Sequence, residues 1–126
     1  MSQLDDSIEV DVISEYLPEQ SVEDEQRYVF AYHIRLINHG EQAATLRSRH
    51  WFIANGNGEV QEVNGEGVVG EQPTLDPGEH YDYSSGAVLA TEVGSMRGYY
   101  VMEAADGTLF HATIPVFTLA IPHALN

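Results

Sequence analysis

The sequence predicts an all-β protein: a single antiparallel β-sandwich of the fibronectin type III-like or immunoglobulin-like kind. About seven short segments alternate apolar and polar residues, and turn residues separate them at near-regular intervals. No stretch of ten residues repeats its apolar positions with the 3.6-residue period of a helix. Many short strands joined by regular turns are typical of two packed antiparallel sheets.

The strongest predicted strand covers residues 27–38. Its apolar face is predicted to contain Tyr28, Phe30, Tyr32, Ile34 and Leu36. The other predicted strands are residues 8–13, 45–54, 59–63, 80–84, 95–104 and 108–115, with 116–121 continuing in an extended form. Within 45–54 the phase of the alternation is ambiguous, because Trp51 and Ile53 lie on one face and Phe52 and Ala54 on the other; this predicts either a strand covered on both faces or a β-bulge.

Three connections have recognisable turn or loop chemistry. Asn55-Gly56-Asn57-Gly58 predicts a tight hairpin turn, because Asn-Gly readily supplies positive φ values. Leu75-Asp76-Pro77-Gly78-Glu79 predicts a type II turn, with proline at the first central position and glycine at the second. Residues 17–26 are rich in carboxylates and contain a proline, so we expect a loop with at most a short helix there.

The 126 residues are the length of one domain. We expect a flexible N-terminal tail at 1–7, the folded domain at 8–122 and a C-terminal tail at 123–126. No cysteine is present, which excludes disulfides, thiolate catalysis and cysteine metal sites. The N-terminus resembles no signal peptide and no segment has the ~18 apolar residues of a membrane span, so we predict a cytoplasmic protein.

The charge is strongly negative. The sequence has twenty acidic residues, five arginines and no lysine, which gives a formal net charge of −15. Such a surface repels phosphate backbones and anionic lipids, so we predict that neither nucleic acid nor a membrane is a partner. An excess of carboxylates also suits a protein that works in concentrated salt, where self-repulsion is screened.

A glycine-rich stretch is the first candidate ligand site. Gly65, Gly67 and Gly70 spell G-x-G-x-x-G, the spacing that binds a pyrophosphate when a helix follows a strand. Here Gln72-Pro73 and a turn follow instead, so we expect no helix after Gly70. We favour a close-packed bend with Val68 and Val69 in the core, and an anion held by backbone N–H groups is the alternative.

The second candidate is a cluster of basic residues with one aromatic side chain. Arg47, Arg49 and Trp51 share a strand face if the pairing is regular, and they would contact an anion or a partner. The favoured interpretation is that Trp51 is a core residue and that the arginines pair with carboxylates. The six histidines form no H-x-H or H-E-x-x-H pattern, so we predict no dedicated metal site. Ser84-Ser85-Gly86 lacks the spacing of a nucleophile elbow and no pair of carboxylates stands out among twenty, so we predict no cofactor and no enzymatic activity.

The same stretches resemble the bacterial ApaG family, also called CorD, in order from about residue 8 to residue 122. The matching motifs are RHWFI at 49–53, NGNG at 55–58, VNGEGVVGEQP at 63–73, LDPGE at 75–79, YSSG at 83–86, GSMRGYY at 94–100 and IPVF at 114–117. This chain departs from the pattern at His50, where tyrosine is expected, and after Thr91, where proline is expected.

The resemblance implies a fibronectin type III-like or immunoglobulin-like sandwich without an established catalytic activity. It also implies a link to cobalt and magnesium homeostasis. Similar domains fused in a eukaryotic F-box protein and in a DNA-polymerase-delta-interacting protein look like modules that bind other proteins. In this family the glycine motif, matched here by Gly65, Gly67 and Gly70, is described as pyrophosphate-type.

We therefore predict a non-enzymatic binding or regulatory domain whose partner is another protein, possible routes being exposed strands, loops and sheet edges. One alternative is a small phosphorylated ligand, a nucleotide or pyrophosphate, at residues 65–70 with Arg47 or Arg49 supplying charge. A third reading is a direct carrier of a divalent metal through surface carboxylates and histidines. Free sheet edges also allow a homodimer.

Overall fold

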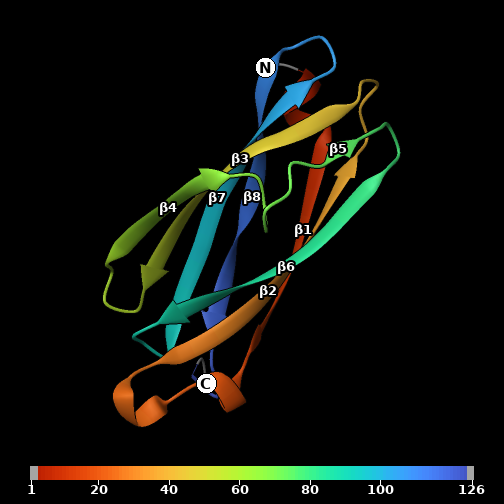
Figure 1. Ribbon diagram of the computed structural model, residues 1–126. Helices are drawn as coiled ribbons and strands as arrows, with labels where there is room; N and C mark the ends of the chain where they lie inside the picture. The colour runs from red at the N-terminus through yellow and green to blue at the C-terminus, as the bar shows by residue number, and fades with distance from the viewer. Residues whose placement is uncertain (1–2, 125–126) are drawn as a thin grey trace.

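Two antiparallel sheets pack face to face in the computed structural model, which describes residues 3–124 (Figure 1). The strands are β1 (Ile8–Tyr16), β2 (Tyr28–Asn38), β3 (Ala44–Asn55), β4 (Val60–Glu66), β5 (Thr74–Leu75), β6 (His80–Leu89), β7 (Val93–Ala104) and β8 (Leu109–Ala120). One sheet has the order β1-β2-β6. The other has the order β4-β3-β7-β8, with β5 added to one end of β3. This arrangement confirms the predicted all-β sandwich.

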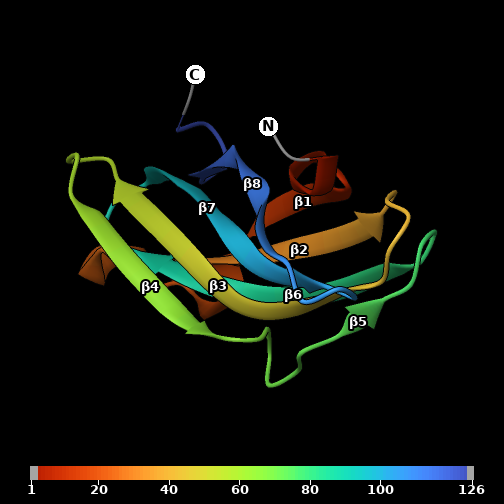
Figure 2. The same cartoon turned by 90° about the horizontal axis from the view of Figure 1, so that it is seen from above.

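The two layers are seen from above in Figure 2. The core lies between them and is built from the inward-facing residues of both sheets. All five residues predicted for the apolar face of residues 27–38 are buried in β2, with relative exposures from 0% to 7%. β3 and β7 supply Leu46, Trp51, Met96, Tyr100 and Met102 from the other side. Period-2 alternation therefore predicted the faces of β2 and β7 correctly, while it left the phase of β3 open.

β-Bulges interrupt two of the pairings. In β3 the register with β7 shifts between Leu46 and Ser48, so the extra residue is Arg47. The bulge brings Leu46 and Trp51, five residues apart, to the same inner face, whereas the register is regular over residues 51–54, where the sequence left the phase open. In β8 the register with β7 shifts opposite Arg97, which places Pro115 within the irregularity. A bulge is one of the few positions where a strand tolerates proline, because no ladder hydrogen bond is lost there.

The predicted turns are present. Glu79 N–H donates to Asp76 O at 2.9 Å and Gly78 has a φ of +86°, as a type II turn with proline and glycine at its centre requires. At Asn55–Gly58 the turn forms, but its positive φ lies on Gly58, at +85°. A type I turn followed by a left-handed glycine is a common hairpin connection and needs no positive φ at the Asn-Gly pair.

The remaining segments are short. Residues 3–124 contain three 3₁₀ turns, namely η1 (Gln3–Asp6), η2 (Pro18–Gln20) and η3 (Glu23–Glu25). The last two fall within the predicted loop 17–26. The backbone oxygen of Ser7 accepts a hydrogen bond from His39 N–H at 2.7 Å. The proposed limits of the domain, 8–122, and of its two tails stay predictions, and residues 1–2 and 125–126 lie outside the described part of the chain.

Candidate functional site

The glycine motif starts in β4 and ends in a tight two-residue turn. Val68 N–H donates to Glu71 O at 2.8 Å and Glu71 N–H donates to Val68 O at 2.9 Å, which closes the turn around Val69 and Gly70. Both central residues have positive φ, +49° for Val69 and +80° for Gly70. This combination is the one that type I′ turns require, and it is strained for a β-branched residue such as valine.

Two of the glycines permit a close approach of other atoms. At Gly65 an added Cβ would come within 2.7 Å of the Arg49 guanidinium. At Gly67 it would overlap the backbone oxygen of Glu71, and the φ of +62° already favours glycine there. Gly70 has open space around it and is needed for its φ alone. The spacing of the motif is thus explained by packing and turn geometry within the loop.

The prediction that no helix follows Gly70 is confirmed. Residues 71–75 run through the bridge at Glu71 into β5, where Leu75 pairs with Ala44 of β3. A helix N-terminus, which supplies the amide groups and dipole of a dinucleotide site, is therefore missing after this motif. The loop also uses its own donors, because Gly67 N–H donates to Arg47 O at 2.8 Å and Val68 N–H to Glu71 O.

The two valines of the loop differ in burial. Val68 is fully buried, as expected, but Val69 is 65% exposed, so the prediction that both point into the core is wrong for Val69. The reason is the two-residue turn. Val68 sits at the paired position that faces the core, whereas Val69 is at the tip, where the chain reverses.

Arg49 holds this loop by its carbonyl groups. Its Nη1 donates to Glu66 O at 3.1 Å and to Gly67 O at 2.9 Å. The positive charge of the guanidinium therefore lies against the backbone carbonyl oxygens of the loop. Since Arg49 lies opposite Gly65 in the β3–β4 pair, the register places the guanidinium in the space that Gly65 leaves.

Arg47 points elsewhere because it is the bulged residue. Its Nε donates to Glu103 Oε1 at 3.1 Å, and its Nη1 donates to Gln72 Oε1 at 3.1 Å. The Gln72 amide in turn donates to Arg47 O at 3.1 Å. The predicted common face holds for Arg49 and Trp51, which pair without a shift opposite Tyr100 and Gly98 of β7, but the bulge displaces Arg47 from it. The two arginines donate to different partners.

Trp51 is a core residue with a relative exposure of 2%. Its ring meets Tyr32 of the opposite sheet at a centroid distance of 5.2 Å and Phe117 of β8 at 5.9 Å, both in edge-on geometry. The hydroxyls of Tyr83 and Tyr100 are hydrogen-bonded beside this cluster. Burial raises the pKa of both hydroxyls well above the usual tyrosine range.

Among residues 3–124, no group of three or more histidine, aspartate or glutamate side chains is arranged to hold a metal ion. No helix in that part of the chain is long and apolar enough to cross a membrane.

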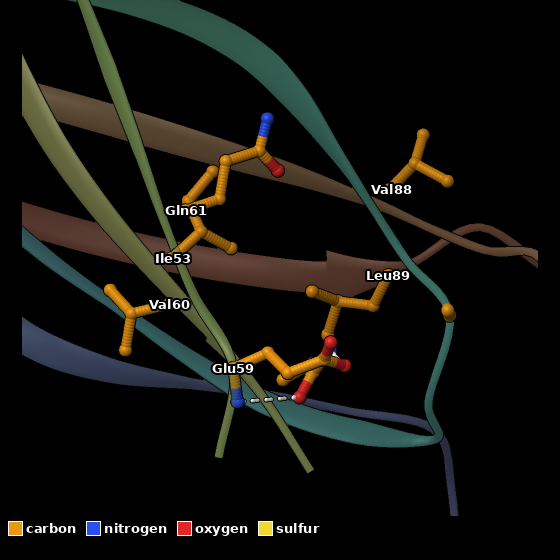
Figure 3. Close-up of a pocket in the computed structure, with 8 residues that line it drawn as sticks. Ile53, Glu59, Val60, Gln61, Val88 and Leu89 are labelled. Atoms are coloured by element: carbon orange, nitrogen blue, oxygen red, sulfur yellow. Dashed lines mark hydrogen bonds between the residues drawn. The ribbon is translucent and has the colours of Figure 1, made fainter. Parts of the chain in front are cut away.

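Sequence reasoning missed a cleft between the two sheets. It has a volume of about 390 Å³ and lies where the end of β6 faces β3 and β4 (Figure 3). The apolar residues that line it are Ile53, Val60, Val88 and Leu89. The predicted strand 80–84 stopped short of it, because Ser84-Ser85-Gly86 resembles a turn although β6 runs on to Leu89. Ala87, Val88 and Leu89 are three consecutive apolar residues, which are too few to show a strand pattern and so did not extend the predicted strand to the cleft.

Comparison with known proteins places this fold in a family. The sequence profile of the ApaG domain matches residues 18–104. The chain belongs to the ApaG family. It is 59% identical over 119 residues to Protein ApaG of Aromatoleum aromaticum, covering 94% of each chain, and 53% identical over 126 residues to Protein ApaG of Pseudomonas paraeruginosa, covering all of both.

A solved structure supports the same assignment. The structure described as a putative ApaA protein from Bordetella pertussis has a TM-score of 0.90 and 47% identity, with 93% of this chain and 95% of that chain covered. The ApaG-domain match includes the glycine loop, Arg49 and β6, but it stops before β8 (Leu109–Ala120) and begins after β1 (Ile8–Tyr16). Both outer strands nevertheless pair with strands inside the match, β1 with β2 and β8 with β7.

Proposed function

We propose that this ApaG-family chain is a non-enzymatic binding or regulatory domain in the cytoplasm and that its partner is another protein. The observation that carries the proposal is the open side of the sandwich. β4 and β6 each end a sheet, and they border one cleft of mixed polar and apolar lining without pairing to each other. On the opposite side, Ser14 Oγ of β1 donates to Thr118 O of β8 at 3.1 Å, which links the two layers.

Strand edges are suitable for protein binding because their outward N–H and C=O groups accept another strand. The cleft beside these edges adds apolar surface, including Val60 at 55% and Val88 at 49% exposure. Removal of apolar side chains at an open edge from water lowers the free energy of the complex, which favours binding of a partner there. A protein segment can use both features at once.

A small phosphorylated ligand at residues 65–70, the alternative, is less well supported by the contacts. Arg49 binds loop carbonyls and Arg47 binds Glu103, so each candidate cation already has partners within the chain. An anion at the turn would have to use the amides of Val69 and Gly70 next to Glu66 and Glu71. Carboxylates so close to an anion weaken its binding.

The link to cobalt and magnesium homeostasis is part of the same proposal as a regulatory role, exerted through the protein partner. Direct carriage of a divalent metal would need converging oxygen or imidazole ligands. The hydrogen bond between Glu9 and His39, at 2.7 Å, and the ion pair between Asp82 and Arg35, at 2.8 Å, already occupy carboxylates on the outer face of the three-stranded sheet.

The test is capture of a partner followed by reconstitution. Because the chain has no lysine, amine coupling attaches it to a surface through its N-terminus alone. A native bacterial extract is passed over this surface and over an unrelated acidic β-sandwich, and each specific partner is purified. Calorimetry with the two purified proteins is expected to show stoichiometric binding.

The same calorimetry separates the alternatives. Titrations with pyrophosphate, nucleotides, magnesium and cobalt are expected to give no saturable heat. Saturable binding of pyrophosphate that Arg49→Met abolishes would replace the proposal with the phosphorylated-ligand function. Failure of every captured protein to bind in purified form would contradict the proposal itself.

A further inference from the structure

β6 presents a long and regular free edge. Among the strands that the structure describes it pairs with β2 alone, and the register runs without a shift from Tyr28 opposite Leu89 to Ile37 opposite His80. In such a strand every second residue directs its N–H and C=O groups away from the neighbour. Among the described residues, none of the backbone hydrogen bonds made outside the strand ladders involves residues 80–89. These outward groups are available to another strand.

β6 also lacks the features with which proteins protect an edge. It contains no proline, lysine or arginine, and the carboxylate of its one acidic residue, Asp82, is held by Arg35 of β2 at 2.8 and 2.9 Å. Residues 84–87 are small, so the backbone is not covered by its own side chains. β8, by comparison, is interrupted at Pro115. Unprotected edges of this kind accept an added strand.

The end of β6 offers room for side chains of such a strand. The 390 Å³ cleft lies on one side of Leu89, and Figure 3 shows Leu89 directed toward it from β6 with Ile53 across the space. A second cleft, of about 450 Å³, also contacts residues 88–90 and is completed by Glu25, Gln26 and Arg27. Main-chain bonds to an edge supply affinity, and pockets for alternate side chains supply specificity.

Charge decides between the occupants. Glu59 is the one charged residue that lines the first cleft, while Glu25 and Arg27 both line the second. The net charge of −15 opposes a second copy of this chain, which would bring the same charge to the edge. A basic segment gains from this field, because lysine or arginine side chains beside the strand would meet carboxylates.

We propose that β6 binds an extended basic segment of a partner protein as an added strand, with one apolar side chain of that segment in the cleft between Leu89 and Ile53. This inference rests on the proposed function and specifies its surface and the chemistry of the partner. The segment alternates apolar residues with lysine or arginine, and it contains no proline where it pairs with residues 80–89.

The experiment uses a displayed library of random 12-residue peptides, selected on the full chain at physiological ionic strength. Selected peptides are expected to alternate apolar and basic residues. The tightest one is synthesised and titrated by fluorescence anisotropy. Val88→Lys is expected to weaken its binding about tenfold or more, since an edge lysine blocks pairing and repels a basic peptide. Val116→Lys is the matched control, because Val116 is 66% exposed on β8.

Hydrogen exchange identifies the binding site directly. Saturation with the peptide is expected to slow exchange of amides within residues 80–89, and a peptide of the same composition with two central prolines is expected not to bind. Equal affinity for wild type and Val88→Lys would overturn the inference, as would equal binding of the proline peptide, protection confined to another strand, or a library that yields no binder. If a purified partner protein binds the Val88→Lys variant as tightly as wild type, this inference is overturned and the proposed function still stands.

Discussion

The guanidinium of Arg49 occupies the space beside Gly65 that a side chain would fill. An added Cβ at Gly65 would lie 2.7 Å from three guanidinium atoms, while Arg49 Nη1 donates to the backbone oxygens of Glu66 and Gly67. The first glycine of the motif is thus explained by the arginine for which it makes room. A cation that binds the carbonyl side of a loop fixes its shape, and this role differs from that of a cation that receives a phosphate.

Gly65→Ala is expected to lower the free energy of unfolding by about 1–3 kcal/mol, because the methyl group displaces the Arg49 guanidinium. Urea denaturation measures the change. In an Arg49→Ala background the same substitution is expected to cost less than half as much, since its collision partner is gone. Equal costs in both backgrounds would show that the guanidinium is not what excludes a side chain at this position.

Val69→Asn is expected to raise the free energy of unfolding by about 0.5–1 kcal/mol. Valine adopts a φ of +49° here under strain, and Asn-Gly is the preferred pair in a type I′ turn. Thermal and urea unfolding check the gain. Val68→Asn is the neighbouring control and should be strongly destabilising, because its side chain is fully buried. A loss of stability in Val69→Asn would contradict the assigned turn.

Alkaline pH is expected to destabilise the fold. Burial raises the pKa of Tyr83 and Tyr100 above the ordinary value of 10.0. Above pH 10 the unfolded chain loses these protons first and binds fewer of them than the folded chain, so stability is complete below pH 10 and falls as the pH rises further. The slope is at most about 1.4 kcal/mol per pH unit for each tyrosine.

Urea unfolding between pH 8 and pH 11.5 tests this dependence. The double variant Tyr83→Phe, Tyr100→Phe has no hydroxyls at these positions, and its stability should fall less steeply with pH. An identical slope for wild type and the double variant would mean that other groups cause the alkaline loss.

Salt is expected to stabilise the protein. With a net charge of −15 the folded chain repels itself, and raising the ionic strength shortens the distance over which these charges interact. The melting temperature should rise as the potassium chloride concentration is increased from low values to the molar range. A melting temperature indifferent to salt would remove the basis for a high-salt habitat.

Alternation was sufficient to predict the strands that cover a core on one face. β2 is the best example, because its five apolar positions were predicted and all are buried. β6 was predicted too short, since Ser84-Ser85-Gly86 has turn composition and only its pairing with residues 31–33 makes it a strand. Tertiary pairing overrides local preference in such segments.

The candidate site was less predictable because it depends on register. The extra residue at Arg47 changes which side chains of β3 face inward, and no local residue pattern predicts the position of this bulge. A shift of one residue moves every following side chain to the other face. The sequence therefore predicted Arg49 as a candidate cation. Its contact with Gly65 could not be predicted, because it depends on the pairing of β3 with β4.

The position of the single indole provides a built-in reporter for this protein. Trp51 is the only tryptophan, and its ring contacts Tyr32 from one layer and Phe117 from the other. Parting of the layers would admit water to the ring and shift its emission to longer wavelength. Intrinsic fluorescence thus follows the integrity of the whole sandwich without any label, in every variant that retains this side chain.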